Sequence, residues 1–338
     1  MFIRLKSILL ITMIVLSCNM SWAKERLEVP IGISPVMSSA AMFIAVEKGY
    51  FEAQDIQPMI NPFKASGAKM VPFLATGQLF VGGGNVSAGM YNAIANDIPI
   101  KIVADKGTVS PGHGYLALLV RKDHVDSGRY QSEKDLKGMT MAITAKGVSQ
   151  QIVTERYLKK AGLLLKDIKL VTLAYSDMMI ALANQSIDAT VQIEPFVAAA
   201  VDKGFAVRVA GNDMIYPNQQ SAVIMMSPIF LEKHPAHAKG FMIAYVRGLR
   251  DYNDAFEKGK GKQEVISILT KYTRIRDKKI YESVVPVGLH PDGLVNIKSL
   301  KDDARWYFEH GYLKSVPDID SIVDLTLIEQ AVKQLGPY

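Results

Sequence analysis

Hydrophobic and polar positions along the chain alternate between a strand period and a helix period. Residues 27–33 form a short branched apolar run typical of a buried strand, and residues 34–39 interrupt it with hydroxyl groups. Apolar residues return at helical spacing over 41–49, which predicts an amphipathic helix. The pattern continues with a strand, a helix and a strand at 56–60, 68–75 and 79–81. This βαβ order predicts a parallel sheet.

A second copy of this order begins at residue 139. Its strands are expected at 139–143, 170–173 and 189–193, its helices at 150–160 and 178–184, and its polar loops at 144–149 and 175–177. In both copies a Gly and then an Asp-Ile pair follow the first helix, at Asp55-Ile56 and at Asp167-Ile168. The duplication predicts a two-lobed α/β fold in which parallel-sheet lobes, flanked by helices, enclose a cleft.

Two segments rich in Gly, Pro and polar residues predict chain crossings between the lobes. The first, 105–114, lies between expected strands at 100–104 and 115–120, and the second, 211–220, precedes an expected strand at 221–226. Residues 228–338 carry mostly helical patterns, at 229–234, 239–256, 262–270, 300–310 and 319–334. We therefore predict a first lobe of residues 24–108 plus 218–338 and a second lobe of residues 109–217.

Residues 1–23 have the pattern of an export signal. Arg4 and Lys6 precede an apolar run over 8–18, and Ser21 and Ala23 supply small residues for cleavage. This pattern predicts a periplasmic protein that starts near residue 24. An alternative is a lipoprotein cleavage box over 15–18, which would leave a lipid anchor on Cys18, the single cysteine.

Cleavage at Ala23 would exclude disulfides, a thiolate nucleophile and cysteine metal sites. No stretch after the leader approaches twenty uninterrupted apolar residues, so we expect no membrane span. The 39 Lys and Arg and the 33 Asp and Glu are spread along the chain. The basic runs at 258–262 and 274–279 are interpreted as solvated helix ends or loops, and no nucleic-acid partner is expected.

Four polar segments follow predicted strands, at 34–39, 82–87, 144–149 and 175–177. In open α/β sheets, ligands bind outside the carboxyl ends of the strands, where helices begin and their free N–H groups accept polar or anionic groups. If the two lobes face each other, all four segments line one cleft. The alternative for each segment taken alone is a helix cap or a tight turn.

Some single residues near these segments are candidates for ligand contacts, and for Glu194, Tyr175 and Phe196 a structural role is an equal alternative. Asn85 can hydrogen-bond a ligand in two directions. Glu194, before Pro195 at a strand end, either recognises an amine or a heterocyclic N–H or complements a helix N-terminus. Tyr175 and Phe196 either stack on a planar ligand or pack in the core or at the rim.

Several catalytic patterns fail. Residues 85–89 lack the first glycine of a nucleophile elbow, and no order of acid and His supports a triad. Residues 112–117 match a dinucleotide fingerprint only superficially, because a strand follows where a helix is required. His234 and His237 have no further ligands nearby. We expect no enzyme activity, no cofactor and no metal.

Five segments together carry a family resemblance: AMFIAVEKGYFE at 41–52, LATGQLFV at 74–81, PIKIVA at 99–104, DLKG at 135–138 and IDATVQIEPF at 187–196. From about residue 27 to residue 234 the chain resembles the extracytoplasmic solute-binding proteins for sulfonates, taurine, nitrate and thiamine-pyrimidine precursors. The resemblance implies a type II periplasmic-binding fold, closure on a small solute, and delivery to an ABC transporter permease in the inner membrane.

The resemblance places solute contacts at 34–39, 83–85, 144–149, Tyr175 and Glu194. Lys146 stands where relatives often have a small residue, and His113 lies in a distinctive crossing; each either recognises an anionic group or is solvated at the rim. The complete candidate set is Ser34, Met37, Ser38, Ser39, Gly83, Gly84, Asn85, Lys106, His113, Thr144, Lys146, Val148, Ser149, Tyr175, Glu194 and Phe196.

The predicted function is capture of a sulfonate-like, aromatic-acid-like or pyrimidine-like solute by a monomeric importer component that closes about a hinge. Two alternatives use the same lobes. One is an enzyme that forms a pyrimidine thiamine precursor, although the cysteine-rich motif of that related family is absent here. The other is a sensor or scaffold protein that presents a ligand to a membrane receptor.

Overall fold

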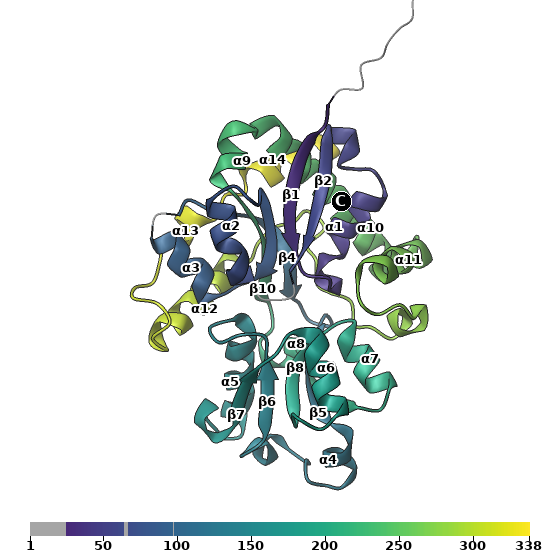
Figure 1. The fold of residues 1–338 in the computed structure, drawn as a ribbon, viewed down its shortest axis with the longest axis vertical. Coiled ribbons are helices and arrows are strands. Elements are labelled where there is room, and N and C mark those ends of the chain that lie inside the picture. The colour runs from purple at the N-terminus through teal and green to yellow at the C-terminus, as the bar shows by residue number, and fades with distance from the viewer. Residues whose placement is uncertain (1–24, 64–66, 97) are drawn as a thin grey trace, which may run out of the picture.

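Two separate five-stranded sheets stand one above the other along the long axis of the molecule (Figure 1). The chain is described from a computed structural model, which covers residues 25–63, 67–96 and 98–338. The predicted leader, with Cys18 and the cleavage site at Ala23, lies outside the described residues. We call the first sheet with its helices the upper lobe and the second sheet with its helices the lower lobe, as they stand in Figure 1.

The two sheets have the same strand order. In the upper lobe the order is β2 (Ile56–Pro62), β1 (Leu27–Ile33), β3 (Val81–Asn85), β10 (Gln219–Met226) and β4 (Lys101–Val109). In the lower lobe it is β7 (Lys169–Thr172), β6 (Thr140–Ile143), β8 (Ala189–Ile193), β5 (Leu116–Arg121) and β9 (Ala206–Gly211). The predicted duplication and the two-lobed α/β fold are therefore confirmed.

The sheets are mixed rather than purely parallel. β1 pairs parallel with β2 and β3, and β6 pairs parallel with β7 and β8, as the βαβ pattern predicts. β10 runs antiparallel between β3 and β4, and β5 runs antiparallel between β8 and β9. β5 and β10 are the first strands after the two crossings, so each enters its sheet from the side of the other lobe.

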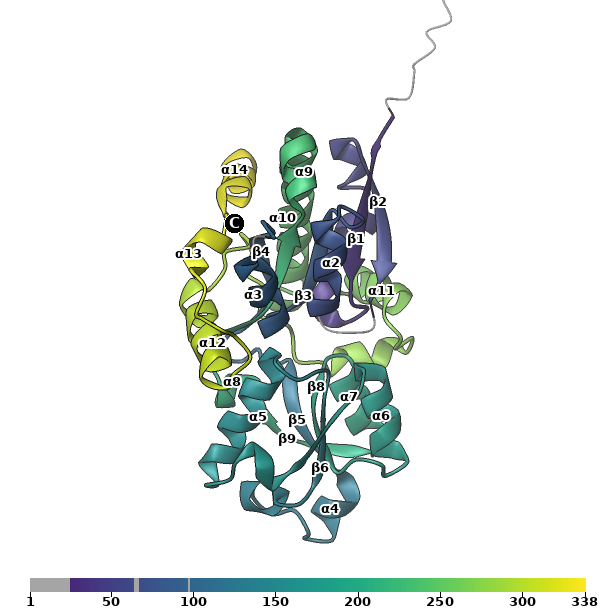
Figure 2. The ribbon, with the colours of Figure 1, turned by 60° about the vertical axis from the view of Figure 1, so that its left-hand side comes forward.

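Helices cover both faces of each sheet, and most of the C-terminal third surrounds the upper lobe (Figures 1 and 2). Their bounds are α1 Ala40–Glu47, α2 Val71–Ala75, α3 Ala88–Ala95, α4 Lys122–Asp126, α5 Ser149–Lys160, α6 Tyr175–Ala183, α7 Phe196–Asp202, α8 Asn212–Ile215, α9 Pro228–Lys233, α10 Pro235–Glu257, α11 Lys262–Tyr272, α12 Ile297–Glu309, α13 Ile319–Ile322 and α14 Thr326–Leu335. The helix expected at 319–334 is thus two helices.

Four further expectations were wrong in detail. The glycine run belongs to β3 and not to a loop, and β4 continues to Val109 through the segment expected to be a crossing. α6 begins at Tyr175, three residues earlier than expected. α1 is buried on all sides over 40–45 rather than amphipathic, because α10 covers its outer face, where a Cβ at Gly248 would lie only 2.1 Å from the carbonyl oxygen of Ala41.

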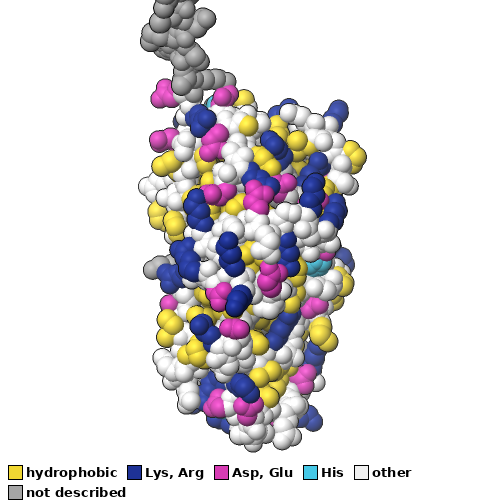
Figure 3. All heavy atoms as spheres, turned by 90° about the vertical axis from the view of Figure 1, so that its right-hand side faces the viewer, with side chains coloured by type: hydrophobic (Ala, Val, Ile, Leu, Met, Phe, Trp, Pro, Cys, Tyr) yellow, Lys and Arg dark blue, Asp and Glu magenta, His cyan; other side chains and the backbone are white. Residues whose placement is uncertain are grey.

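The chain crosses between the sheets at 110–115 and at 212–218, between β4 and β5 and between β9 and β10. The predicted lobe boundaries at 108/109 and 217/218 lie close to these crossings and stay a prediction. Among the described residues, no helix is long and apolar enough to span a bilayer. On the face in Figure 3, Lys and Arg alternate with Asp and Glu among the described residues, without an extended patch of one sign.

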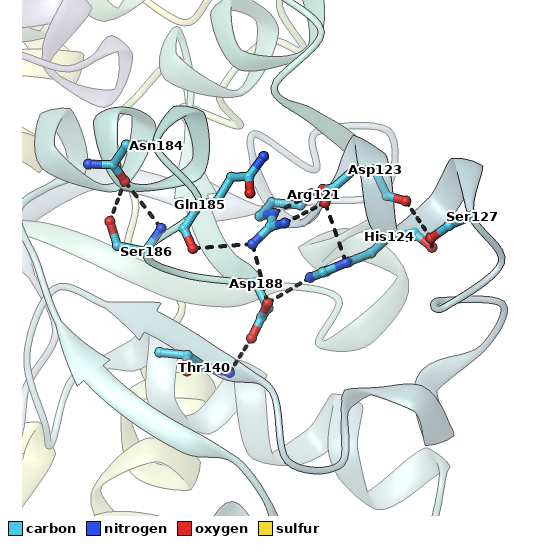
Figure 4. Close-up of polar contacts among 9 residues, drawn as sticks. All are labelled: Arg121, Asp123, His124, Ser127, Thr140, Asn184, Gln185, Ser186 and Asp188. Atoms are coloured by element: carbon cyan, nitrogen blue, oxygen red, sulfur yellow. Dashed lines mark hydrogen bonds and ion pairs between the residues drawn. The ribbon is translucent and has the colours of Figure 1, made fainter.

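A partly buried polar cluster joins elements of the lower lobe at the end far from the upper sheet (Figure 4). Asp188 accepts hydrogen bonds from the Thr140 N–H at 2.8 Å and bonds His124 Nε2 at 2.6 Å. Arg121 bonds the carboxylate of Asp123 and donates to the carbonyl of Gln185 at 3.2 Å. The cluster joins the end of β5 to the starts of β6 and β8, so its role is structural.

Candidate functional site

A small recess lies where the two lobes meet at the carboxyl ends of their strands. Its volume in this structure is about 20 Å³, room for about one water molecule, and both lobes line it. The upper lobe contributes Ser34, Pro35, Val36, Phe63 and Arg274, and the lower lobe contributes Tyr175, Ser176 and Phe196. Three predicted site residues, Ser34, Tyr175 and Phe196, are therefore brought together across the cleft.

Backbone hydrogen bonds join the lobes beside this recess. The Ala88 N–H donates to the carbonyl of Gly147 at 2.9 Å, and the Ser149 N–H donates to the carbonyl of Val86 at 3.1 Å. Ser87 and Val148 form an antiparallel bridge between these two bonds. The N-termini of α3 and α5 consequently face each other, and the structure represents a closed arrangement of the lobes.

Glu194 makes two further contacts between the lobes. Its backbone carbonyl accepts the Met37 N–H at 3.1 Å, and its Oε1 accepts the Val285 N–H at 3.1 Å, while Oε2 accepts the Ala198 N–H of its own lobe at 3.0 Å. Burial raises the pKa of Glu194 to about 7, although the two N–H groups act in the opposite direction. Glu194 thus links the closed lobes and also complements a helix start, the second of the two roles considered for it.

Asn85 and Tyr175 meet across the cleft. Asn85 Nδ2 lies 3.3 Å from the Tyr175 hydroxyl, which extends from the first turn of α6. Burial raises the pKa of Tyr175 to about 12, so its hydroxyl stays protonated at neutral pH. This pair forms one edge of the cleft, beside the recess that Tyr175 lines.

Lys106 lies behind the loop that follows β1. Its side chain is 2% exposed, and Nζ donates to Ser38 Oγ at 2.8 Å. The stem crosses Gly83, where a Cβ would lie 2.9 Å from Lys106 Cδ. The absence of a side chain at Gly83 therefore leaves room for the side chain of Lys106. It does not bring a ligand close to the backbone at this position.

Helices from different lobes also pack beside the cleft, where α12 contacts α5. Glu155 on α5 accepts the indole N–H of Trp306 at 2.5 Å and bonds His310 Nε2 at 2.9 Å, both through Oε2. Gln151, one turn earlier, bonds the Tyr312 hydroxyl at 2.9 Å. In Figure 2, α12 lies at the junction between the lobes, above α5.

The remaining predicted residues do not line the recess. Ser39 Oγ donates to the Ser34 carbonyl at 2.7 Å, the Thr144 N–H and hydroxyl bond Gln150, and Gly84 is paired with Val223 inside the upper sheet. Lys146 is exposed. His113 bonds Glu257 at 2.9 Å and lines a different cavity, of about 480 Å³, near the first crossing.

Sequence reasoning missed Phe63 and Arg274 in the recess and Glu155 at the contact between α5 and α12. Arg274 was assigned to a solvated basic run; it is exposed, lies at the mouth of the recess, and has no ion-pair partner among the described residues. A lone Arg in a basic run carries no local signal that separates a cleft position from a solvated one. Phe63 and Glu155 depend on contacts made by segments distant in sequence.

The lining of the recess is mostly apolar and hydroxyl-bearing. Its titratable side chains are Tyr175 and Arg274, and the raised pKa of Tyr175 makes its hydroxyl a poor general base at neutral pH. Its hydroxyl groups, from Ser34 and Ser176, have no neighbouring His or carboxylate among the lining residues. Among the described residues, no group of three or more His, Cys, Asp or Glu is placed to hold a metal ion.

The fold and the cleft together define the class: a two-lobed α/β protein of the periplasmic-binding type. The chain belongs to the NMT1-like family, which it matches over residues 23–269. A comparison with curated proteins gave no match.

Solved structures of binding proteins share the fold. The alkanesulfonate-binding protein SsuA from Xanthomonas axonopodis pv. citri, bound to MOPS, superposes with a TM-score of 0.72 at 20% identity, over 89% of this chain and 99% of that one. The periplasmic nitrate-binding protein NrtA from Synechocystis PCC 6803 gives 0.74 at 14% identity, over 92% and 90%. The desulfurization enzyme DSZB also has the fold, with 0.67 at 13% identity over 92% and 100%. These likenesses confirm the predicted fold.

Proposed function

We propose that the chain is the periplasmic solute-binding component of an ABC importer. It captures a small organic solute, sulfonate-like, aromatic-acid-like or pyrimidine-like, and delivers it to a permease in the inner membrane. The observation that carries this proposal is the set of hydrogen bonds that join the two lobes around the recess. Family membership and the binding-protein neighbours support it.

The closed arrangement explains how solute binding would drive closure. Most of the lobe contacts described above are hydrogen bonds, and each neutral one gives only a modest net gain because it replaces hydrogen bonds to water. A solute seated at the recess, which has to widen to admit it, adds contacts to Tyr175 and Phe196 from one lobe and to Ser34 and Phe63 from the other. Because these contacts exist together only when the lobes meet, the solute shifts the equilibrium toward the closed form.

A thermal-shift screen of the purified chain tests the proposal, since a ligand that binds the native state raises the melting temperature. The screen should include sulfonates, aromatic acids, pyrimidines and nitrate. At least one class should give a saturable shift that Tyr175→Ala abolishes and Phe308→Ala retains; Phe308 is an exposed aromatic of α12, outside the recess. Shifts unaltered by Tyr175→Ala would place the solute elsewhere.

A second experiment separates the importer role from an enzyme and from a sensor. The solute should be recovered unchanged after incubation, and the chain should co-purify with a transport permease. DSZB shows that the fold also occurs in an enzyme, and turnover of a solute or of a pyridoxal cofactor would favour that alternative. Co-purification with a membrane sensor would favour ligand presentation.

A further inference from the structure

Lys106 is the extra residue of a bulge in β4. The register pairs Asp105 with Val223 and Gly107 with Ala222 on β10, and Lys106 stands between them without a partner. A bulge of this kind re-aims one side chain and is frequent beside functional sites. Here it directs an amine beneath the loop after β1, onto the hydroxyl of Ser38.

No carboxylate neutralises this amine. Among the described residues, Lys106 Nζ forms no ion pair, and its hydrogen-bond partner is the uncharged hydroxyl of Ser38. The adjacent Asp105 is fully engaged: its Oδ1 accepts from the Gly107 N–H at 2.8 Å, from the Gln220 amide at 2.6 Å and from the Thr108 hydroxyl, and its Oδ2 accepts from the His290 N–H at 2.8 Å. A lysine this deeply buried is ordinarily paired.

The amine lies next to the cleft. Its partner Ser38 follows Met37, whose N–H bonds Glu194 of the lower lobe. Gly83, which the lysine stem crosses, is two residues from Asn85, and Asn85 meets Tyr175 of the lower lobe. Residues one and two positions along the chain from those that touch Lys106 therefore make contacts between the lobes.

We infer that the solute carries an oxyanionic head group, a carboxylate or a sulfonate, which the Lys106 amine and the Ser38 hydroxyl bind together. This inference rests on the proposed function and narrows its solute classes to acids. The anion supplies the countercharge that the protein omits, and a charge-assisted hydrogen bond of this kind is stronger than one between neutral groups. A pyrimidine without an acidic group would leave the amine unpaired.

The ionisation of Lys106 gives the inference a second readout. Burial lowers the pKa of Lys106 to about 7, an effect that the charge of Asp105 only partly opposes. A bound anion would raise this pKa again, so binding at pH 8 should take up about one proton per solute, and at pH 6 much less. Glu194 would add proton uptake at lower pH instead. Its pKa of about 7 in the closed form means that closure takes up a proton near pH 6.

Isothermal titration calorimetry on the full chain tests the inference. The solutes that shift the melting temperature should be titrated together with four probes that share a phenyl ring and differ in charge: benzoate, benzenesulfonate, benzamide and benzylamine. Oxyanions should bind, and Lys106→Met should weaken them about ten- to hundredfold. The control Lys301→Met, which alters an exposed lysine of α12, should stay within about twofold.

The outcomes separate this inference from the proposed function. A chain that binds none of the solutes contradicts the proposed function itself. Binding of neutral or cationic solutes without binding of any oxyanion contradicts only the inference. The same holds if the Lys106→Met variant folds and binds oxyanions as tightly as the wild-type chain. If Lys106→Met does not fold, the wild-type chain decides the matter: heats in buffers of different ionisation enthalpy should report the proton uptake at pH 8, and its absence would overturn the assignment.

Discussion

The contact between α5 and α12 gives a quantitative test of lobe closure. Glu155 receives the Trp306 indole and the His310 ring from across the junction, and its carboxylate is 7% exposed. Burial acts to raise the pKa of Glu155, but Lys159, His310 and Trp306 outweigh it and lower the pKa, so the group is ionised at neutral pH. Hydrogen bonds to a charged group contribute about 1.5–3 kcal/mol each.

Solvent screening reduces this sum, and we expect Glu155→Ala to disfavour the closed form by roughly 2 kcal/mol. If opening separates α5 from α12, the apparent affinity for the solute falls about 30-fold. Calorimetric titration with the solute that gives the largest thermal shift measures this change, with circular dichroism as the check on folding.

Lys159→Ala is the matched control. Lys159 Nζ bonds Glu155 Oε1 at 2.6 Å within α5, and its side chain is 56% exposed. An exposed pair within one helix contributes less than about 0.5 kcal/mol, so this variant should bind within about twofold of wild type. Equal affinity for Glu155→Ala and wild type, or an equal loss in both variants, would refute the assignment of Glu155 to closure.

Three further predictions follow from single contacts. Gly83→Ala should retain the fold, because the new methyl group meets the flexible side chain of Lys106. It should weaken oxyanion binding in calorimetry, because Lys106 has to move; unchanged affinity would contradict the role of Lys106. Because burial raises the pKa of Glu194 to about 7 from 4.5, the closed chain keeps a proton that an exposed carboxyl releases, and the free energy of unfolding falls by roughly 3 kcal/mol from pH 4.5 to 7. Glu194→Gln should flatten the dependence of the urea midpoint on pH between pH 4.5 and 7. Parallel profiles for the variant and the wild type would exclude this contribution of Glu194. Burial acts to raise the pKa of Asp188, but the Thr140 N–H and the His124 ring outweigh it and lower the pKa, so the carboxylate stabilises the fold above its ordinary pKa and loses this effect in acid. Asp188→Asn should therefore cost about 1–3 kcal/mol at pH 7 and little at pH 3 by urea unfolding; equal costs at both pH values would argue against the pair.

Features that depend on local periodicity were predictable from the sequence. The strand and helix order of the two copies follows from alternation and helical spacing, which short segments encode by themselves. The equal strand orders, β2-β1-β3-β10-β4 and β7-β6-β8-β5-β9, confirm the duplication. The positions of Ser34, Tyr175 and Phe196 at one recess follow from a second rule, because the carboxyl ends of the parallel strands in both sheets face the cleft.

Features that depend on distant partners were not predictable. The antiparallel direction of β10 and β5 is set by the direction in which the chain enters each sheet after a crossing. The linking role of Glu194 depends on the Val285 N–H, 91 residues further along. The glycine run looked like a loop because glycine is rare inside strands, but at Gly83 the missing side chain makes room for Lys106 from a different strand.

The most direct test of the central claim is equilibrium dialysis of the purified chain against the solute found by thermal shift, followed by mass spectrometry of the recovered solute. Saturable binding of one solute per chain, with the solute chemically unchanged, is the result that the closed two-lobed cleft predicts. A chemically converted solute, or uptake that does not saturate, would contradict it.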